Sequence, residues 1–188
     1  DLVAHVDVIV NAAAESHVEK SIEEGASEFV TTNVEGTQIL LDAIRRAPVE
    51  RFILVSSSEV YGTAVTDPMD ESHPLEPRSP YAATKAGGDR LAYSYHVTYG
   101  LDTVITRGSN TYGPYQHPEK LIPLFTTNAL AGEQLPMYGD GMQVRDWLHV
   151  ADHAAGIDLV LRHGEPGEAY NVAGEHLVPN REVIARLL

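Results

Sequence analysis

The residues that suit proton-transfer chemistry gather after one apolar run of the chain. Ser57 and Glu59 follow residues 52–55, whose length and side chains predict a buried strand. Tyr81 and Lys85 lie four positions apart in a predicted helix, so their phenol and ammonium groups share one helix face. A lysine in that position lowers the pKa of the phenol and makes it a proton acceptor. The pattern therefore indicates a site for acid–base catalysis.

The elements that must position these groups have signals of their own. Ser79 is a suitable N-cap, and Pro80 a suitable first-turn residue, for the helix that carries the tyrosine. Polar side chains also follow two other predicted strands, at Asn11 and at residues 109–110. The carboxyl ends of parallel strands meet at one edge of a sheet, so these groups are expected to converge on a ligand site. Taken singly, a tyrosine–lysine pair more often reflects surface packing, and a serine-rich strand end more often forms a turn.

Most of the chain resembles the extended short-chain dehydrogenase/reductase family, and within it the nucleotide-sugar 4,6-dehydratases. The likeness rests on residues 13–18, 59–62, 79–81, 110–115, 118–124 and 144–148. The dTDP-glucose 4,6-dehydratases are the most similar, but they carry Thr-Asp-Glu where this chain has Ser57-Ser58-Glu59. GDP-mannose 4,6-dehydratases carry Thr-Ser-Glu there, and UDP-glucuronate decarboxylases also carry Ser beside Glu. The departure bears on the substrate and the reaction more than on the family.

The resemblance implies roles for particular residues. It implies that the catalytic residues are Ser57, Ser58, Glu59, Tyr81 and Lys85. It implies that NAD lies against Ala12, Ala13, Thr32, Ser56, Tyr81 and Lys85. It implies that a nucleotide-diphosphate sugar is bound by Ser16, His17, Asn110, Lys120, Leu121, Pro136, Tyr138, Arg145 and Asn180. For Arg145, an ion pair with Asp146 or with another surface acid is an equally good interpretation of the sequence.

The reaction implied by the resemblance is an NAD-dependent 4,6-dehydration, with oxidation at C4, elimination of water across C5 and C6, and return of hydride to C6. Glu59 is placed to remove the C5 proton, whereas a solvent-exposed glutamate at a strand end is the alternative. A 4-epimerase of the same family needs only the serine, tyrosine and lysine, and leaves Glu59 without a role. A UDP-glucuronate decarboxylase and a non-catalytic fragment that only binds a sugar nucleotide are further alternatives.

The composition and the net charge limit the classes of molecule that the protein can bind. The 188 residues are 43% hydrophobic, enough for one substantial core and a minor lobe. A formal net charge of −14, from 27 acidic and 13 basic residues, argues against binding to nucleic acid or to an anionic membrane. The chain has no cysteine, no signal-like start and no apolar run long enough to span a membrane, which favours a cytoplasmic protein. The nine histidines are scattered without metal-ligand spacing.

The order of elements predicts an α/β fold, with a Rossmann-like parallel sheet flanked by helices and a small α/β substrate-binding lobe. Strands near Val8, Ile53 and Val104 are expected to be parallel and adjacent. Residues 1–112 are expected to form a partial NAD-binding domain and residues 113–188 a partial sugar-nucleotide lobe, and the two are allowed to interleave. No glycine-rich dinucleotide turn occurs, so the first β-α units of the fold are expected to be missing.

Periodicity and composition also predict the remaining elements. Helices are expected at residues 28–47, 80–99, 118–130 and 149–161, with a helix beginning at 181. Short strands or extended pieces are expected at residues 7–11, 102–107, 135–139, 144–148 and 169–172. The family resemblance implies a homodimer, formed by the helix of residues 32–44 and the Tyr81–Lys85 helix against their symmetry mates.

Overall fold

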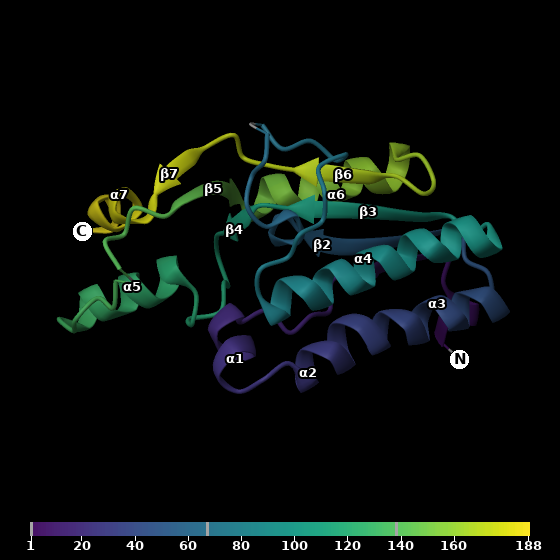
Figure 1. The fold of residues 1–188 in the computed structure, drawn as a ribbon, viewed down its shortest axis with the longest axis horizontal. Coiled ribbons are helices and arrows are strands. Elements are labelled where there is room, and N and C mark those ends of the chain that lie inside the picture. The colour runs from purple at the N-terminus through teal and green to yellow at the C-terminus, as the bar shows by residue number, and fades with distance from the viewer. Residues whose placement is uncertain (1, 67, 138) are drawn as a thin grey trace. The chain divides into compact units, whose positions relative to one another are not determined.

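A computed structural model describes residues 2–66, 68–137 and 139–188 (Figure 1). The chain divides into two compact units that alternate along the sequence. The first unit comprises Asp1–Gly108 and Gly156–Val172, and the second comprises Ser109–Ala155 and Ala173–Leu188. The chain therefore leaves the first unit close to the predicted boundary at residue 112 and later returns to it, so the two units are interleaved in sequence.

The first unit is built around a parallel sheet with the strand order β1-β2-β3-β6. Its strands are β1 (Val8–Asn11), β2 (Arg51–Ser57), β3 (Thr103–Gly108) and β6 (Ala169–Val172). Val10 pairs with Ile53, and Ile53 pairs with Val104, which confirms the predicted parallel, adjacent strands. A parallel sheet is covered on both faces, which explains why Phe52, Ile53 and Leu54 are consecutive apolar residues that are almost wholly buried.

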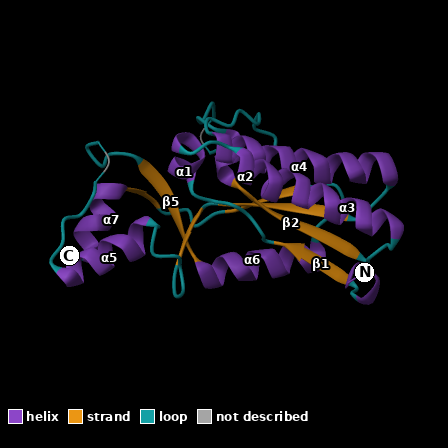
Figure 2. Ribbon diagram, turned by 90° about the horizontal axis from the view of Figure 1, so that it is seen from below, coloured by secondary structure: helices purple, strands orange, loops and turns teal. Residues whose placement is uncertain are grey.

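Helices cover both faces of this sheet. They are α3 (Gly36–Arg46), α4 (Pro80–Tyr99) and α6 (Val150–His163). Figure 2 shows α3 and α4 on one face and α6 on the other. Because side chains alternate along a strand, Phe52 and Leu54 pack in one cluster with Leu41 of α3, whereas Ile53 packs with Val160 of α6. This is the predicted Rossmann-like arrangement.

The helix predicted at residues 28–47 consists of three parts. They are α2 (Ser27–Phe29), the π-helical segment η2 (Val30–Glu35) and α3. The π-helical segment buries Asn33, and such wide turns are frequent at functional sites. The shorter elements of this unit are the 3₁₀ turns η1 (Leu2–His5) and η3 (Ser58–Tyr61) and the helix α1 (Val18–Glu23).

The second unit contains a small sheet with the strand order β4-β5-β7, in which β4 is parallel and β7 antiparallel to β5. Its elements are β4 (Asn110–Tyr112), β5 (Val144–His149), β7 (Leu177–Pro179), α5 (Leu121–Ala131) and α7 (Asn180–Leu187). The helix α5 packs against α7. The strands β4 and β7 are not predicted, because three residues are too few to show a period. The extended piece expected at residues 135–139 contains Tyr138, which lies outside the described residues, and its other residues form no strand.

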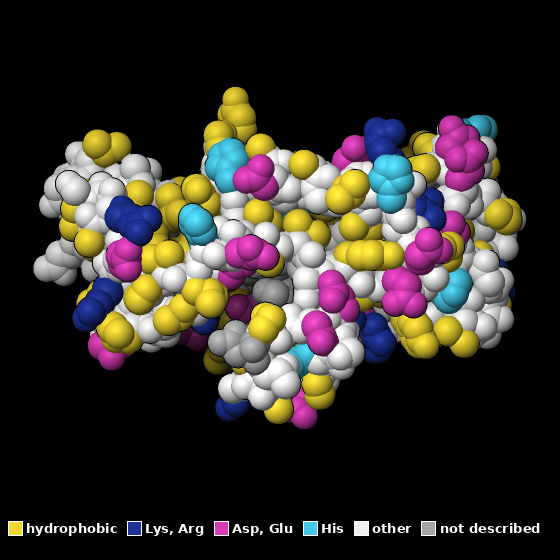
Figure 3. Space-filling view, turned by 90° about the horizontal axis from the view of Figure 1, so that it is seen from above, with side chains coloured by type: hydrophobic (Ala, Val, Ile, Leu, Met, Phe, Trp, Pro, Cys, Tyr) yellow, Lys and Arg dark blue, Asp and Glu magenta, His cyan; other side chains and the backbone are white. Residues whose placement is uncertain are grey.

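The charged groups on the surface reflect the excess of acidic residues in the sequence. Figure 3 shows acidic side chains scattered over the face in view, with the Lys and Arg side chains lying apart from one another. Within the described ranges, none of the helices combines the length and the apolar character that a membrane crossing needs.

Candidate active site

The strand β2 ends in a rigid turn that carries the predicted hydroxyl and carboxyl groups. The Ser57 Oγ accepts a hydrogen bond of 3.2 Å from the Glu59 backbone N–H and thereby caps η3. Gly62 ends this turn with a φ of +74°, and a Cβ there would lie 2.0 Å from the Glu76 carbonyl oxygen. The turn holds Ser57, Ser58 and Glu59 half-buried at the carboxyl end of the sheet.

The Tyr81 side chain is fixed in the first turn of α4. As predicted, Ser79 caps this helix, and its Oγ accepts a hydrogen bond of 3.1 Å from the Ala82 N–H. The Tyr81 N–H donates a hydrogen bond of 3.2 Å to Ser21 Oγ of α1. The Tyr81 ring meets Phe29 edge-on, with ring centroids 6.4 Å apart. Contacts on the backbone and the ring therefore fix where the phenol points.

The phenol of Tyr81 lies close enough to the Ser57 hydroxyl and the Glu59 carboxylate for both to affect its pKa. Burial raises the pKa of Tyr81, the Ser57 hydroxyl lowers it and the charge of Glu59 raises it, so the net direction is upward. The expectation that Lys85 lowers the pKa of this phenol is wrong, because the net shift is upward and Lys85 is not among its causes. Burial of the phenol is the largest effect. The Lys85 ammonium group donates its hydrogen bond to the backbone carbonyl of Val55.

The Lys85 ammonium group binds the sheet directly. Its Nζ donates a hydrogen bond of 2.7 Å to the Val55 carbonyl of β2, and only 6% of the residue is exposed. Burial lowers the pKa of Lys85 to about 8, against the opposing effect of the Asp89 carboxylate one turn further along α4. A lysine with such a pKa exchanges its proton readily, so it suits a proton relay beside Tyr81.

A buried asparagine holds the helix that carries Tyr81 and Lys85. The Asn33 side chain of η2 donates a hydrogen bond of 3.0 Å to Thr84 Oγ1 and exchanges two hydrogen bonds of 3.0 Å with the Glu15 backbone. Thr84 lies between Tyr81 and Lys85 on α4. The sequence marks Asn33 as a polar residue inside an apolar helical pattern, and the family resemblance implies that it lies near the cofactor with Thr32. The sequence gives no sign of Thr84.

The residues expected to contact NAD lie at the carboxyl ends of β1 and β2 and in η2. Ser56 is 6% exposed, and within the described ranges its Oγ has no hydrogen-bond partner. Ala12 and Ala13 follow β1 with small exposed side chains, and Thr32 is half-buried in η2. An orphaned buried hydroxyl beside small side chains, at the ends of adjacent parallel strands, fits a dinucleotide cofactor. The part of the chain that the structure describes contains no His, Cys, Asp or Glu cluster suited to a metal ion.

Two of the expected substrate residues lie in the first unit. Ser16 and His17 are half-buried and lead into α1, which packs against α4. The Nδ1 of His17 accepts a hydrogen bond of 3.1 Å from the Lys20 N–H and so caps α1. The same short helix supplies Ser21, the partner of the Tyr81 backbone.

The other expected substrate residues lie in the second unit. Asn110 begins β4, Leu121 begins α5 and Lys120 is the residue just before it. Pro136 is an exposed loop residue, and Arg145 and Asn180 lie on β5 and α7. Tyr138 lies outside the described residues. Arg145 pairs with Val178 in the β5–β7 ladder, and the Asn180 N–H at the start of α7 donates a hydrogen bond of 3.0 Å to the Gln143 carbonyl, two residues before Arg145. The Arg145 side chain is exposed, and its Nη1 donates a hydrogen bond of 3.2 Å to the Val144 carbonyl. Asp146, the ion-pair partner considered for Arg145, accepts hydrogen bonds from the backbone N–H groups of Gly174 and His176.

Comparison with known proteins shows close relatives over the full length of this chain. A family model described as GDP-mannose 4,6 dehydratase matches residues 2–186. The low-salt glycan biosynthesis protein Agl12 of Haloferax volcanii is 53% identical over 188 residues, which are 100% of this chain and 60% of that protein. The dTDP-glucose 4,6-dehydratase of Streptomyces niveus is 52% identical over 188 residues, which are 100% of this chain and 56% of that enzyme.

A solved structure with ligands has the same fold. The crystal structure of DesIV, a dTDP-glucose 4,6-dehydratase from Streptomyces venezuelae with NAD and TYD bound, is 56% identical and has a TM-score of 0.96 to this chain, covering 100% of this chain and 59% of that one. The chain thus spans somewhat more than half the length of these relatives. The resemblance drawn from the sequence motifs is confirmed, and the chain belongs to the GDP-mannose 4,6 dehydratase family.

Proposed function

We propose that the full-length protein containing this chain is a cytoplasmic, NAD-dependent hydro-lyase that converts dTDP-glucose to dTDP-4-keto-6-deoxyglucose. One observation carries the proposal: within one compact unit, the Tyr81 phenol of α4 lies close to Ser57 and Glu59, and Lys85 of the same helix bonds the Val55 carbonyl of the strand that ends in Ser57. The identity of 52% and 56% to dTDP-glucose 4,6-dehydratases supports the choice of substrate.

The first step is oxidation at C4 of the sugar. Tyr81, as phenolate beside Lys85, takes the proton of the C4 hydroxyl, while Ser57 donates a hydrogen bond to the same oxygen. Bound NAD⁺ would accept the C4 hydride and, once reduced, return it to C6, and its positive charge would favour the phenolate. The groups proposed to hold it are Ala12, Ala13, Thr32 and Ser56, together with Tyr81 and Lys85.

The second step is elimination of water. The keto group at C4 acidifies the C5 hydrogen, and Glu59 removes it as general base. The protonated Glu59 then gives this proton to the hydroxyl that leaves C6 as water, while Ser58 donates a hydrogen bond only. Hydride adds to C6 and a solvent-derived proton to C5, which completes the 4-keto-6-deoxy sugar. Glu59 is half-buried in a capped turn, which suits this role better than that of an exposed surface glutamate.

We assign the nucleotide-diphosphate part of the substrate to cations and polar groups of the second unit. Arg145 and Lys120 are the residues proposed to bind the diphosphate, because guanidinium and ammonium groups match phosphate oxygens. The residues proposed to bind the remainder are Asn110, Leu121, Pro136, Tyr138 and Asn180, with Ser16 and His17 of the first unit. In a chain with a net charge of −14, such local cations decide where a dianionic ligand binds.

We also propose a homodimer formed by α3 and α4. These helices lie side by side, and they expose apolar side chains to solvent: Ile39 of α3 and Tyr93, Val97 and Tyr99 of α4. Pairing with the same helices of a second copy buries these side chains in a four-helix contact. Light scattering of the full-length protein at micromolar concentration is expected to give the mass of a dimer, and a monomer would contradict the contact.

A 4-epimerase is the competing function, because it uses Ser57, Tyr81 and Lys85 and leaves Glu59 unused. The two are separated by incubating the full-length protein with dTDP-glucose, UDP-glucose, GDP-mannose or UDP-glucuronate and identifying the products by mass spectrometry and NMR. Loss of one water from dTDP-glucose is the expected result. A product of unchanged mass with inverted C4, or a decarboxylated product, would contradict the proposal.

A further inference from the structure

A buried ion pair lies one helical turn beyond the catalytic lysine. Asp89 of α4 is completely buried, and only 2% of the Arg107 side chain of β3 is exposed. The Arg107 Nε donates to Asp89 Oδ2 at 2.9 Å, and its Nη2 donates to Asp89 Oδ1 at 3.1 Å. This two-pronged geometry fixes the guanidinium relative to the helix that carries Tyr81 and Lys85.

The third nitrogen of the same guanidinium contacts Tyr61, a residue of the turn that carries Glu59. Its Nη1 donates a hydrogen bond of 2.9 Å to the Tyr61 hydroxyl, and the guanidinium carbon lies 5.0 Å from the centroid of the Tyr61 ring. Tyr61 is the last residue of η3, the turn that begins with Ser58 and Glu59. Arg107 therefore bridges the helix of the phenol and the turn of the carboxylate.

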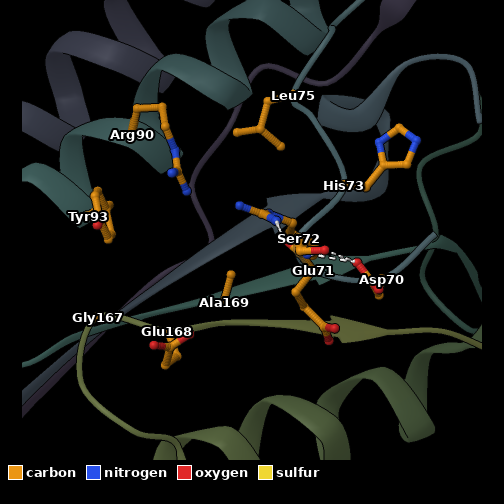
Figure 4. A pocket seen from close by; sticks show the side chains of 11 residues that line it. Asp70, Glu71, Ser72, His73, Leu75, Arg90, Tyr93, Gly167, Glu168 and Ala169 are labelled. Carbon is orange, nitrogen blue, oxygen red and sulfur yellow. Dashed lines mark hydrogen bonds between the residues drawn. The ribbon is translucent and has the colours of Figure 1, made fainter. Parts of the chain in front are cut away.

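Further hydrogen bonds connect Tyr61 and Arg107 to the loop after η3 and to the edge strand β6. The Tyr61 hydroxyl donates a hydrogen bond of 2.7 Å to Asn171 Oδ1 of β6, and the Asn171 N–H donates one of 2.8 Å to Glu71 Oε1. Arg107 Nη1 also donates to the Glu71 carbonyl at 3.2 Å. Figure 4 shows Glu71 directed toward β6, beside a cavity of about 660 Å³ that Arg107 helps to line. Hydrogen bonds around Tyr61 and Arg107 thus connect the loop that contains Glu71, the turn η3 and the strand β6.

Stability alone is a weak reason for this arrangement. Burial lowers the pKa of Arg107, but Asp89 and Tyr61 together raise it by more, so the net direction is upward and the guanidinium stays charged. Buried ion pairs contribute little net stability over well-packed apolar residues, whereas their directional hydrogen bonds fix geometry. Here those bonds connect the two elements whose relative position the chemistry depends on.

We propose that Arg107 is a positioning residue, which, through Asp89 and Tyr61, sets the distance between the Glu59 turn and the Tyr81–Lys85 face of α4. This inference rests on the proposed function, because only a reaction that uses Glu59 after C4 oxidation requires that distance to be fixed. A 4-epimerase does not require it.

The sharpest test is Tyr61→Phe in the full-length protein, since it keeps the ring and removes only the hydroxyl between Arg107 and Asn171. A misplaced Glu59 is expected to lower kcat by about 10- to 100-fold with KM nearly unchanged. Reduced nicotinamide is expected to accumulate during turnover, because oxidation proceeds and elimination lags. Amide hydrogen exchange is expected to become faster in residues 58–62. Tyr170→Phe is the matched control, because it removes a hydroxyl that accepts a 2.7 Å bond from the Glu165 N–H elsewhere in this unit.

A second pair of variants tests the guanidinium itself. Arg107→Lys keeps the charge but cannot bond Asp89 and Tyr61 in the same geometry, and is expected to show the same three changes. Arg51→Lys is its control, because Arg51 makes an equally two-pronged pair with Asp102 at the opposite end of β2.

Two outcomes would overturn the inference: exchange in residues 58–62 that matches the controls, or kcat that falls with no accumulation of reduced nicotinamide. If the wild-type protein yields no dehydrated sugar, the proposed function fails by itself. The exchange comparison needs no turnover and still decides whether Arg107 and Tyr61 position the turn.

Discussion

The Lys85 ammonium group lies 2.7 Å from the Val55 carbonyl oxygen and donates a hydrogen bond to it. Val55 precedes Ser56 and Ser57 in β2, and Lys85 follows Tyr81 by one turn of α4. This bond connects the strand that supplies the hydroxyl with the helix that supplies the phenol. Groups on both sides of the junction are therefore expected to act on one substrate oxygen.

Replacing Tyr81 by Phe in the full-length protein is expected to lower kcat by about 10²- to 10⁴-fold, the usual contribution of a general base. Binding of the sugar nucleotide is expected to remain nearly intact, because the ring keeps its edge contact with Phe29. Steady-state kinetics and calorimetric titration measure the two effects, with Tyr170→Phe as the control. Near-normal turnover of Tyr81→Phe would assign the proton transfer to another group.

Lys85 is expected to make the protein more stable as the pH rises. Its pKa is about 8 in the folded protein and 10.5 as the ordinary value, so between these values the unfolded chain binds more protons than the folded one. The contribution of this group to the free energy of unfolding therefore rises from about pH 8 to 10.5 and is constant below pH 8. Urea denaturation of the nucleotide-free protein at several pH values measures it. Lys85→Met should lack this part of the rise, and Lys20→Met, at a half-buried lysine paired with Glu28, should keep it. Equal slopes in all three proteins would contradict the prediction.

Breaking the buried pair of Asp89 and Arg107 is expected to destabilise the protein strongly. Asp89→Ala leaves the guanidinium buried without its counter-charge, which typically lowers the free energy of unfolding by about 3–5 kcal/mol. Asp158→Ala is the control, because it removes an exposed pair with Arg162 within one helix and should change stability far less. Urea denaturation compares the two, and a similar small loss in both would contradict the burial of this charge.

The sequence predicts the helix of Tyr81 and Lys85 and the strand of Ser57 well because their signals are local. Ser79 and Pro80 mark the start of α4 and Gly100, with a φ of +71°, marks its end, so the predicted and observed bounds agree. The apolar run at residues 52–55 predicts β2 and, with it, the place of Ser57. Residues bonded within one turn, such as Ser57 and Glu59, can be placed by spacing alone.

Relationships between distant residues are not visible in the sequence. Arg107 is a charged residue inside a buried strand, and only the fold shows that Asp89 and Tyr61 are its partners. The return of Gly156–Val172 to the first unit likewise depends on pairing between β3 and β6. The direction of the Tyr81 pKa also depends on burial, which spacing does not reveal.

Glu59→Gln separates oxidation from elimination. Glutamine keeps the size of the side chain but cannot take the C5 proton, so product formation is expected to fall by about 10²- to 10⁴-fold. Reduced nicotinamide is expected to form and persist when dTDP-glucose is added, which absorbance spectroscopy records. Glu76→Gln, an exposed residue of the following loop, is expected to behave as wild type. Normal turnover of Glu59→Gln would remove this residue from the chemistry.

The label at C5 of the product tests the proposed dehydratase function most directly. In this reaction the C5 hydrogen is lost to Glu59 and replaced from solvent, whereas a 4-epimerase never breaks that bond. The full-length protein is incubated with dTDP-glucose in heavy water, and the isolated product is examined by NMR and mass spectrometry. The predicted result is a 4-keto-6-deoxy sugar with deuterium at C5. An unlabelled product with only its C4 configuration inverted would contradict it.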